Sequence, residues 1–164
     1  DREQLVRKVE IIPVEVIIRN IATGTLTKRL GVEEGLKLKK PLIEFTLKSD
    51  ELDDPILSEE HIEVLEYAKK DEMKNIKEQA LIINSLLLDL FSSINIILVD
   101  FKIEFGRYGS DNKVILADEI SPDSCRLWDK LSSEKLDKDR FRKNLGGLID
   151  AYKEVATRLG IKIQ

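Results

Sequence analysis

The chain has 164 residues, of which 42% are hydrophobic and 35% charged, and its formal net charge at pH 7 is −4. That length is sufficient for one domain with a substantial core, and the slight acidity argues against nucleic acid or an anionic membrane as a partner. The single cysteine, Cys125, excludes an internal disulfide. Because no signal-peptide pattern opens the chain, we expect a cytoplasmic protein.

The first predicted element covers Leu5 to Ile21, which is rich in valine and isoleucine and is interrupted by Pro13. This composition predicts two strands or one bent strand. Side chains alternate between the two faces of a strand, which places Val14, Val16 and Ile18 on one face and Glu15, Ile17 and Arg19 on the other. One face is therefore apolar, and the other carries the charged groups.

A turn of small residues, Thr23-Gly24-Thr25, follows that strand and precedes a short predicted helix from Leu26 to Leu30, which Gly31 ends. Unpaired backbone N–H groups at a helix start can bind an anion, and Arg19 stands upstream to add positive charge. An ordinary capped helix is about twice as common an explanation of the same pattern.

The next stretch alternates between irregular and regular segments. Leu36 to Lys40 indicates a basic turn before Pro41, and Leu42 to Lys48 predicts a strand. The acidic run from Asp50 to Pro55 predicts a loop.

Two helices are predicted after this loop, one capped by Ser58 and reaching about Lys69, and a longer one capped by Asp71. The longer helix carries an apolar stripe at three- and four-residue spacing, formed by Ile76, Ala80, Ile83, Leu87 and Leu90. Polar residues interrupt the apolar stretch from Leu81 to Val99, so we interpret it as a core helix leading into a strand and not as a membrane span.

The stretch from Ile97 to Gly106 is the centre of the candidate site. As a strand it places Phe101, Ile103 and Phe105 on one face and Asp100, Lys102 and Glu104 on the other. The apolar run at its start indicates a buried strand, and a partly buried row of acid, base and acid is costly unless another charge balances it. A metal-bound phosphate would do so, whereas a solvated strand face with ion pairs is an alternative of about equal weight.

A hairpin is predicted to follow, with a turn from Arg107 to Asn112 and a returning strand from Lys113 to Asp118. If Tyr108 pairs with Val114, then Glu104 lies opposite Asp118. Like charges directly opposite each other are destabilising, so either the register differs or a cation lies between the two carboxylates. This arrangement favours magnesium, which prefers oxygen ligands.

The last third begins with Ser121 to Asp129, which we expect to be a loop rich in hydrogen-bonding groups. A final helix is predicted to open near Asp139 and to end at Gly160, with a buried face formed by Leu145, Leu148, Ile149, Tyr152, Val155 and Leu159. Gly146-Gly147 inside that helix costs about 2 kcal/mol relative to alanines, which indicates close packing or a close ligand. The basic cluster from Lys138 to Lys143 needs Asp139 or a bound anion to offset it at a helix start.

Several common sites are missing from the pattern. Neither a Walker phosphate loop nor Gly-x-Gly-x-x-Gly occurs, so a nucleotide site here would lack its usual glycine-rich part. No histidine lies near Cys125 in the sequence, which argues against a thiolate nucleophile. The single histidine, His61, is expected to be exposed and is given no role.

Three stretches together resemble one family, the SAICAR synthetases of purine biosynthesis: Ile12-Pro13-Val14-Glu15-Val16 with Arg19-Asn20, Leu98 to Gly106, and Ser121 to Asp129. The resemblance covers essentially all 164 residues and implies an α+β fold, an ATP-grasp-like second lobe whose mixed or antiparallel sheet is packed by helices. It also implies that residues 1–164 are a single C-terminal portion of the enzyme, without the N-terminal lobe that covers ATP, and this portion alone is expected to be inactive.

The resemblance implies an ATP-dependent ligase that joins carboxyaminoimidazole ribonucleotide and L-aspartate through an acyl phosphate, giving SAICAR, ADP and phosphate. The implied cofactors are ATP and Mg²⁺, the implied partners are the small-molecule substrates, and a homo-oligomer is compatible with them. Two rival functions are a module that only binds the ribonucleotide and a phosphotransferase that acts on a hydroxyl group, which would need a base to activate that hydroxyl.

Site residues also follow from the resemblance, by motif position. Glu104 and Asp118 would hold magnesium, Lys102 would neutralise the transferring phosphoryl group, and Asp100 and Asp123 would orient the aminoimidazole carboxylate or a second metal. The residues implied to bind substrate are Arg19, Thr25, Arg126, Lys138 and Arg142, with Lys48 and Asp54 for L-aspartate. Thr25 stands where many members of the family have serine, which keeps the hydroxyl donor and adds a methyl group.

Overall fold

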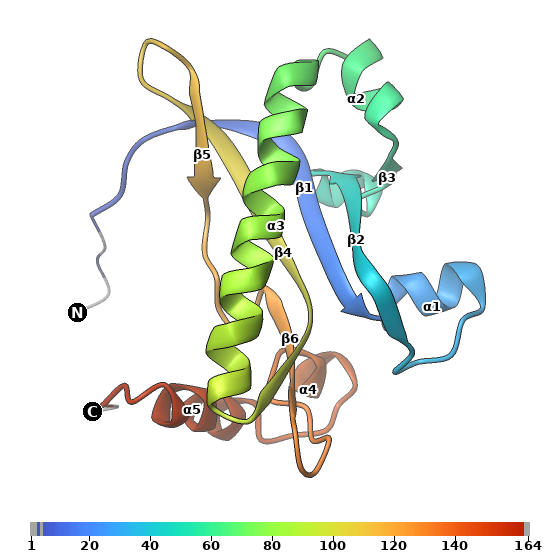
Figure 1. The fold of residues 1–164 in the computed structure, drawn as a ribbon, viewed down its shortest axis with the longest axis vertical. Helices are drawn as coiled ribbons and strands as arrows, with labels where there is room; N and C mark the ends of the chain where they lie inside the picture. Colours follow the sequence, from blue (N-terminus) through green and yellow to red (C-terminus); the bar gives the residue numbers. More distant parts are fainter. Residues whose placement is uncertain (1–2, 4, 163–164) are drawn as a thin grey trace.

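The computed structural model describes residue 3 and residues 5–162, which form one antiparallel sheet and several helices (Figure 1). The strands are β1 (Glu10–Ile21), β2 (Lys37–Leu47), β3 (Ile56–Leu57), β4 (Ile96–Tyr108), β5 (Lys113–Ala117) and β6 (Cys125–Asp129). The helices are α1 (Thr25–Leu30), the 3-10 helix η1 (Asp50–Leu52), α2 (Glu59–Val64), α3 (Lys70–Ser93), α4 (Asp139–Arg142) and α5 (Leu148–Arg158). The strand order is β3-β2-β1-β4-β5, and β6 also pairs with β4. The predicted α+β fold is confirmed.

The long helix α3 runs along one face of the sheet and packs against β1 and β4 (Figure 1). The core between them contains alternate strand residues and one side of the helix: Val14, Val16, Ile18, Phe101, Ile103, Phe105, Met73, Ile76 and Ala80. Because strand side chains alternate, the opposite face of β1 and β4 carries the charged groups. The apolar and charged faces predicted for both strands are confirmed.

Strand β4 pairs with β1 along one edge and with both β6 and β5 along the other. The prediction of a loop from Ser121 to Asp129 is therefore wrong for its second half, where β6 forms. Residues in β6 alternate between buried and half-buried. The polar residues around this strand made the segment resemble a loop in the sequence. The β4–β6 register shifts between Leu98 and Asp100, and this bulge lets Leu98 and Phe101 both face the core.

The first two strands differ in extent from the prediction. Regular pairing in β1 begins at Glu10, and its register with β4 shifts between Ile11 and Glu15, around Pro13. The turn predicted for Leu36 to Lys40 is wrong, because β2 already begins at Lys37 and passes through Pro41. Proline is tolerated there because β3 pairs only with Phe45 and Thr46, which leaves this part of β2 as a sheet edge.

The β4–β5 hairpin has a register one residue away from the predicted one. Tyr108 pairs with Lys113, so the residue opposite Glu104 is Ala117 and not Asp118. Asp118 follows the end of β5 with a positive φ of 60°, because the chain leaves the ladder at that point. The turn is also shorter than expected, since β4 continues through Tyr108.

The two middle helices begin close to the predicted positions. Ser58 caps α2 by accepting a hydrogen bond from the backbone N–H of His61, but the helix ends at Val64 instead of near Lys69. Helix α3 begins at Lys70, so Asp71 lies inside its first turn and is not the cap. Of the predicted stripe, Leu90 is exposed, while Met73 and Phe91 are buried in addition. No helix in the described part of the chain is long and apolar enough to cross a membrane.

The C-terminal helix predicted from Asp139 to Gly160 is two helices, α4 and α5. Gly146 and Gly147 separate them, with φ of 69° and 63°. Residues other than glycine rarely adopt such positive φ values. Because the break turns α5, its buried residues are Ala151 and Val155, whereas Leu145 and Ile149 are exposed.

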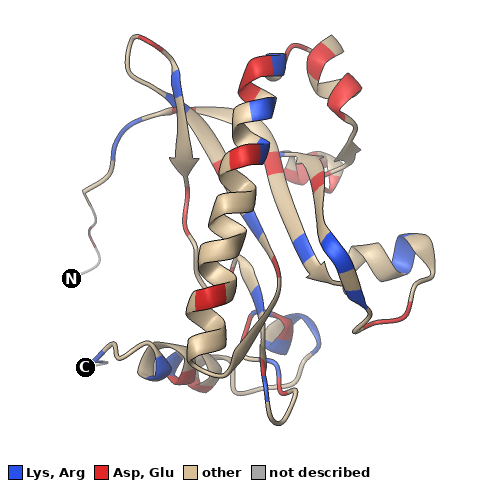
Figure 2. Ribbon diagram, viewed as in Figure 1, with Lys and Arg blue, Asp and Glu red and all other residues tan. Residues whose placement is uncertain are grey.

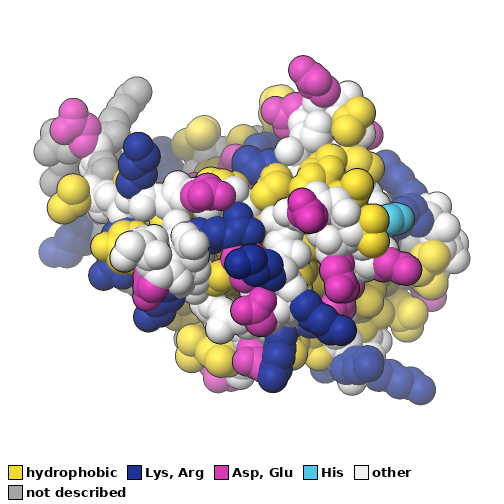
Figure 3. Space-filling model, turned by 90° about the horizontal axis from the view of Figure 1, so that it is seen from above, with side chains coloured by type: hydrophobic (Ala, Val, Ile, Leu, Met, Phe, Trp, Pro, Cys, Tyr) yellow, Lys and Arg dark blue, Asp and Glu magenta, His cyan; other side chains and the backbone are white. Residues whose placement is uncertain are grey.

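Charges on the outer surface are mixed. In the view from above, Lys and Arg side chains are interspersed with Asp and Glu (Figure 3). This dispersed pattern differs from the ordered charges on the open face of the sheet, which is the face of β1 and β4 opposite α3.

Candidate functional site

A cleft of about 740 Å³ lies over the charged face of β1 and β4, on the side of the sheet away from α3. Helix α1, residues 53–56 and the segment before β6 form its other walls. The predicted site residues that line it are Arg19, Thr25, Asp54, Asp100, Lys102, Asp123, Arg126 and Arg142. The structure thus brings together most of the predicted site from elements that are distant in the sequence.

Arg19 projects from β1 into the cleft, and its guanidinium group is fully engaged. Its Nε donates to Glu44 Oε2 at 2.6 Å, Nη1 donates to Asp100 Oδ2 at 2.7 Å, and Nη2 donates to Thr25 Oγ1 at 2.9 Å. The side chain is only 2% exposed, so these partners balance a buried charge. Thr25, at the start of α1, therefore orients Arg19 as well as facing the cleft.

Asp100 joins Arg19 to a second arginine. Arg126 on β6 donates from Nη1 to Asp100 Oδ2 at 2.8 Å and from Nε to Asp139 Oδ2 at 3.1 Å. Burial raises the pKa of Asp100, and the two guanidinium groups oppose that shift. Burial likewise works against ionisation of Asp139, but Arg126 and Arg142 lower its pKa.

A row of alternating charges therefore runs along the cleft from α1 through β2, β1, β4 and β6 to α4. In order, the row contains Arg29, Glu44, Arg19, Asp100, Arg126, Asp139 and Arg142. Basic segments are visible on β1, β6 and α4 (Figure 2). Such a row holds several guanidinium groups in place next to open space, which suits recognition of anions.

Gly24 lies directly beneath this row. A Cβ atom at this position would lie 2.7 Å from Arg126 Nη2, and the backbone has φ of 60° and ψ of −128°. That combination is essentially restricted to glycine. The small residue before α1 therefore leaves the space that Arg126 occupies.

A second group of charges lies toward the other end of the same face. Glu15 on β1 pairs directly across the sheet with Glu104 on β4, and both are buried. Lys102 Nζ binds Glu15, which also accepts from Thr46 Oγ1 at 2.8 Å, and Lys48 Nζ binds Glu104 Oε1 at 2.6 Å. The predicted pairing of Glu104 with Asp118 across the hairpin is wrong. A pair of like charges that we did not predict, Glu15 and Glu104, instead lies across β1 and β4, and two lysines balance it.

Lys48, Glu104 and Asp118 lie together at this end of the face. The hydrogen bond from Lys48 to Glu104 raises the pKa of the lysine, and the charges of Glu104, Glu15 and Asp118 add to the effect. Among the described residues, no three His, Cys, Asp or Glu side chains are grouped so that they could hold a metal ion by themselves. No hydrogen bond or ion pair joins Lys48 to Asp54 among the described residues; Asp54 instead accepts a hydrogen bond from the backbone of Ser49 at 3.0 Å.

Asp123 stands at the rim of the cleft, in the segment between β5 and β6. Lys138 Nζ donates to its Oδ2 at 2.8 Å, and the hydroxyl of Tyr152 donates to its Oδ1. Both bonds lower the pKa of Asp123, the one from Lys138 more strongly. Cys125 is buried nearby, and burial raises the pKa of its thiol to about 12, in line with the prediction that it is no nucleophile.

Four partners of the site were given no functional role from the sequence: Glu15, Glu44, Asp139 and Tyr152. Glu15 could have been found by the same argument as Asp100, because it is an acid on a buried strand. The partners Glu44 and Tyr152 depend on contacts over 25 and 29 residues, for which one sequence carries no signal.

Comparison with known proteins gives consistent matches. The family model described as SAICAR synthetase matches residues 1–159. A phosphoribosylaminoimidazole-succinocarboxamide synthase of Pelagibacter ubique is 57% identical over 98% of this chain, and the chain spans 62% of that relative's length. The crystal structure of the synthase of that name from Ehrlichia chaffeensis covers 99% of the chain with a TM-score of 0.96 and 49% identity, and the chain covers 70% of it. A SAICAR synthetase solved in complex with ADP covers 96% of the chain with a TM-score of 0.91 and 46% identity, and the chain covers 67% of it.

Proposed function

The chain belongs to the SAICAR synthetase family, and on that premise we propose that the complete protein joins carboxyaminoimidazole ribonucleotide and L-aspartate at the expense of ATP. The products are SAICAR, ADP and phosphate. The ADP complex of a relative that is 46% identical supports the use of ATP. Because the chain spans about 62% of the length of its curated relatives, the proposal concerns the complete protein.

The reaction needs activation because a carboxylate is a poor electrophile. An oxygen of the aminoimidazole carboxylate attacks the γ-phosphorus of ATP, the bond between the β- and γ-phosphates breaks, and ADP leaves. The amine of L-aspartate then attacks the acyl phosphate carbon, phosphate leaves with the electrons of the C–O bond, and the amine loses a proton. In this proposal Lys102, on the open face of β4, neutralises the transferring phosphoryl group.

The carboxylates near Lys48 suit a magnesium ion. Magnesium is usually held by one or two carboxylates together with substrate phosphates, so a group of three protein ligands is not required. The ammonium group of Lys48, whose Nζ lies 2.6 Å from Glu104 Oε1 and is also influenced by the charge of Asp118, supports this proposal because it already places a positive charge beside Glu104. We assign Glu104 and Asp118 to magnesium, which when bound offsets the charge of the ATP phosphates.

The arginines of the alternating row suit the anionic groups of the ribonucleotide. Arg142 is 46% exposed and Arg126 faces the cleft, so both can donate to phosphate or carboxylate in the planar geometry that guanidinium favours. Arg19 and Thr25 complete this wall, and Lys138 supports it through Asp123. Asp100 and Asp123 orient the aminoimidazole carboxylate, and Lys48 with Asp54 serves L-aspartate.

The observation that carries the proposal is the charged face of β4, where Asp100 and Lys102 line the cleft beside ordered arginines and Glu104 lies toward the other end of the same face. The test measures ADP release by the complete protein with each substrate alone and with both. We expect release only when the ribonucleotide and L-aspartate are both present, with SAICAR formed in equal amount. Steady release with either one alone, or formation of a phosphorylated hydroxyl compound, would contradict the proposal. Binding of the ribonucleotide without turnover would support a binding module instead.

A further inference from the structure

Asp123 occupies an exposed and irregular position for a residue that must be held in place. It lies between β5 and β6, outside the sheet ladder, and its side chain is 42% exposed. Such a carboxylate can rotate unless both of its oxygens are fixed. Functional groups need orientation by neighbouring residues when their own backbone does not supply it.

The structure fixes the two oxygens from two separate elements. Lys138, immediately before α4, donates to Oδ2 at 2.8 Å, and Tyr152, from α5, donates to Oδ1. The backbone N–H of Asp123 also donates to Ser121 Oγ at 3.1 Å, which holds the turn. Each carboxylate oxygen thus has one donor, and the plane of the group is determined.

Tyr152 makes this contact from a helix that begins directly after a break in the C-terminal segment. Gly146 and Gly147 redirect the chain, and Ala151 and Val155 then anchor α5 against the core. The same docking turns Tyr152 toward Asp123. The residue does not itself line the cleft, so it reaches the site through the carboxylate.

We infer that Tyr152 is a positioning residue, whose hydroxyl holds the Asp123 carboxylate in the orientation that the aminoimidazole carboxylate requires. This inference rests on the proposed function for its chemistry. The inference also explains the role of the Gly146-Gly147 break, because the helix that follows the break brings Tyr152 to the rim of the cleft. Burial and the bond to Asp123 both raise the pKa of Tyr152, which keeps the hydroxyl as a donor.

The test replaces Tyr152 by phenylalanine in the complete protein, which removes one oxygen atom and keeps the ring. We expect kcat/KM for the ribonucleotide to fall by about 10-fold or more, as small misplacement of a catalytic group costs this order of rate. KM for ATP should change little. Tyr67→Phe is the matched control, because Tyr67 is also half-buried and the described residues provide no hydrogen-bond partner for its hydroxyl.

A double-mutant cycle separates positioning from general support of the fold. In an Asp123→Asn background, Tyr152→Phe should lose most of its effect on kcat/KM, since the hydroxyl acts through that carboxylate. A full effect in this background, or kinetics of Tyr152→Phe equal to those of Tyr67→Phe, would overturn the inference.

The wild type, Tyr152→Phe, Asp123→Asn and the double variant can also be compared by urea unfolding, which requires no turnover. Non-additive midpoints support the contact even if the wild-type protein forms no SAICAR, a result that would contradict the proposed function alone. Additive midpoints would overturn the contact itself.

Discussion

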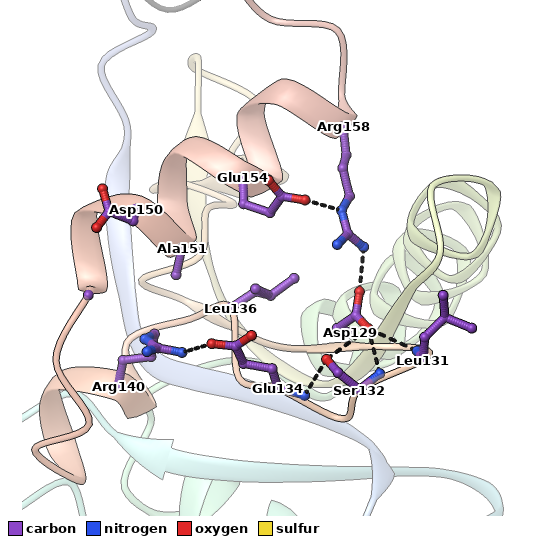
Figure 4. A pocket seen from close by; sticks show the side chains of 11 residues that line it. Asp129, Leu131, Ser132, Glu134, Leu136, Arg140, Asp150, Ala151, Glu154 and Arg158 are labelled. Carbon is purple, nitrogen blue, oxygen red and sulfur yellow. Dashed lines mark hydrogen bonds and ion pairs between the residues drawn. The ribbon is translucent and has the colours of Figure 1, made fainter.

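Two of the hollows lined by charged side chains differ in what those charges do. The cleft over β4 has six basic lining residues: Arg19, Lys28, Arg29, Lys102, Arg126 and Arg142. A second hollow of about 530 Å³ lies between the segment after β6 and α5, and its basic lining residues are Arg140 and Arg158 (Figure 4). The first hollow is therefore suited to anions, and the second is not.

In the second hollow the charges neutralise one another and hold turns together. Arg158 binds Glu154 and Asp129, each at 2.7 Å, and Arg140 binds Glu134 at 2.6 Å (Figure 4). Arg140 also donates to the carbonyl of Gly146 at 2.6 Å. Hydrogen bonds from the backbone of Ser132 and from Arg158 lower the pKa of Asp129. These contacts close the turn after β6 onto α5. In the cleft, by contrast, carboxylates hold Arg126 and Arg142 in place while these arginines still line the open space.

Among changes that test this difference between the two hollows, Asp100→Asn in the cleft should have the largest effect. The change leaves Arg19 and Arg126 facing an uncharged amide, and breaking a buried ion pair costs about 3–5 kcal/mol of unfolding free energy. Turnover of the folded protein should fall by about 100-fold or more, because a preorganised charge is lost. Urea unfolding and ADP release measure the two effects.

The control in the second hollow is Glu154→Gln. Its pair with Arg158 is half-exposed and should contribute only about 0.3–0.5 kcal/mol, with unchanged turnover. Equal losses for the two variants would remove the distinction between the hollows.

A smaller change in the cleft is Arg19→Lys, which keeps the charge but removes the planar fork. Lysine cannot reach Glu44, Asp100 and Thr25 together. Loss of one or two charged hydrogen bonds, each about 1.5–3 kcal/mol, should weaken ribonucleotide binding by at least about 10-fold. Calorimetry with the complete protein measures the affinity. Wild-type affinity would show that the geometry of this guanidinium is not needed.

Gly24→Ala tests the space beneath the alternating row. The backbone conformation alone should cost about 1–3 kcal/mol, and the added Cβ displaces Arg126, so ribonucleotide affinity should fall as well. Gly31→Ala shares a positive φ, but apart from its neighbours along the chain no atom lies within 4 Å of the added Cβ. It should therefore cost about 1–2 kcal/mol without loss of affinity. A loss of affinity for both variants would point to α1 as a whole and not to Arg126.

The smallest expected effect is the pH dependence of Glu34. Hydrogen bonds from Lys143 and Thr23 lower its pKa to about 2, from an ordinary value of 4.5. A depressed carboxyl pKa adds stability that is present above about pH 4.5 and is lost as the pH falls toward 2. Glu34→Gln should thus flatten the acid side of the stability curve slightly, because the group is half-exposed. Parallel curves for the variant and the wild type would exclude this contribution.

The sequence alone determined the features that depend on local periodicity. The faces of β1 and β4, the short helix ended by Gly31 and the row of Asp100, Lys102 and Glu104 were all predicted, because alternation along a strand is a property of neighbouring residues. The resemblance to the family also rested on motifs in these segments.

Only the tertiary structure decided which of these charges meet. A one-residue change of register moved Asp118 from its expected place opposite Glu104, while Glu15 on another strand took that position. The β6 strand and the bulge in β4 brought Arg126 to the cleft, and α5, which follows the break at Gly146-Gly147, brought Tyr152 to Asp123 at the cleft rim. Register, bulges and helix docking depend on the sum of contacts between distant segments, so no single stretch of sequence contains them.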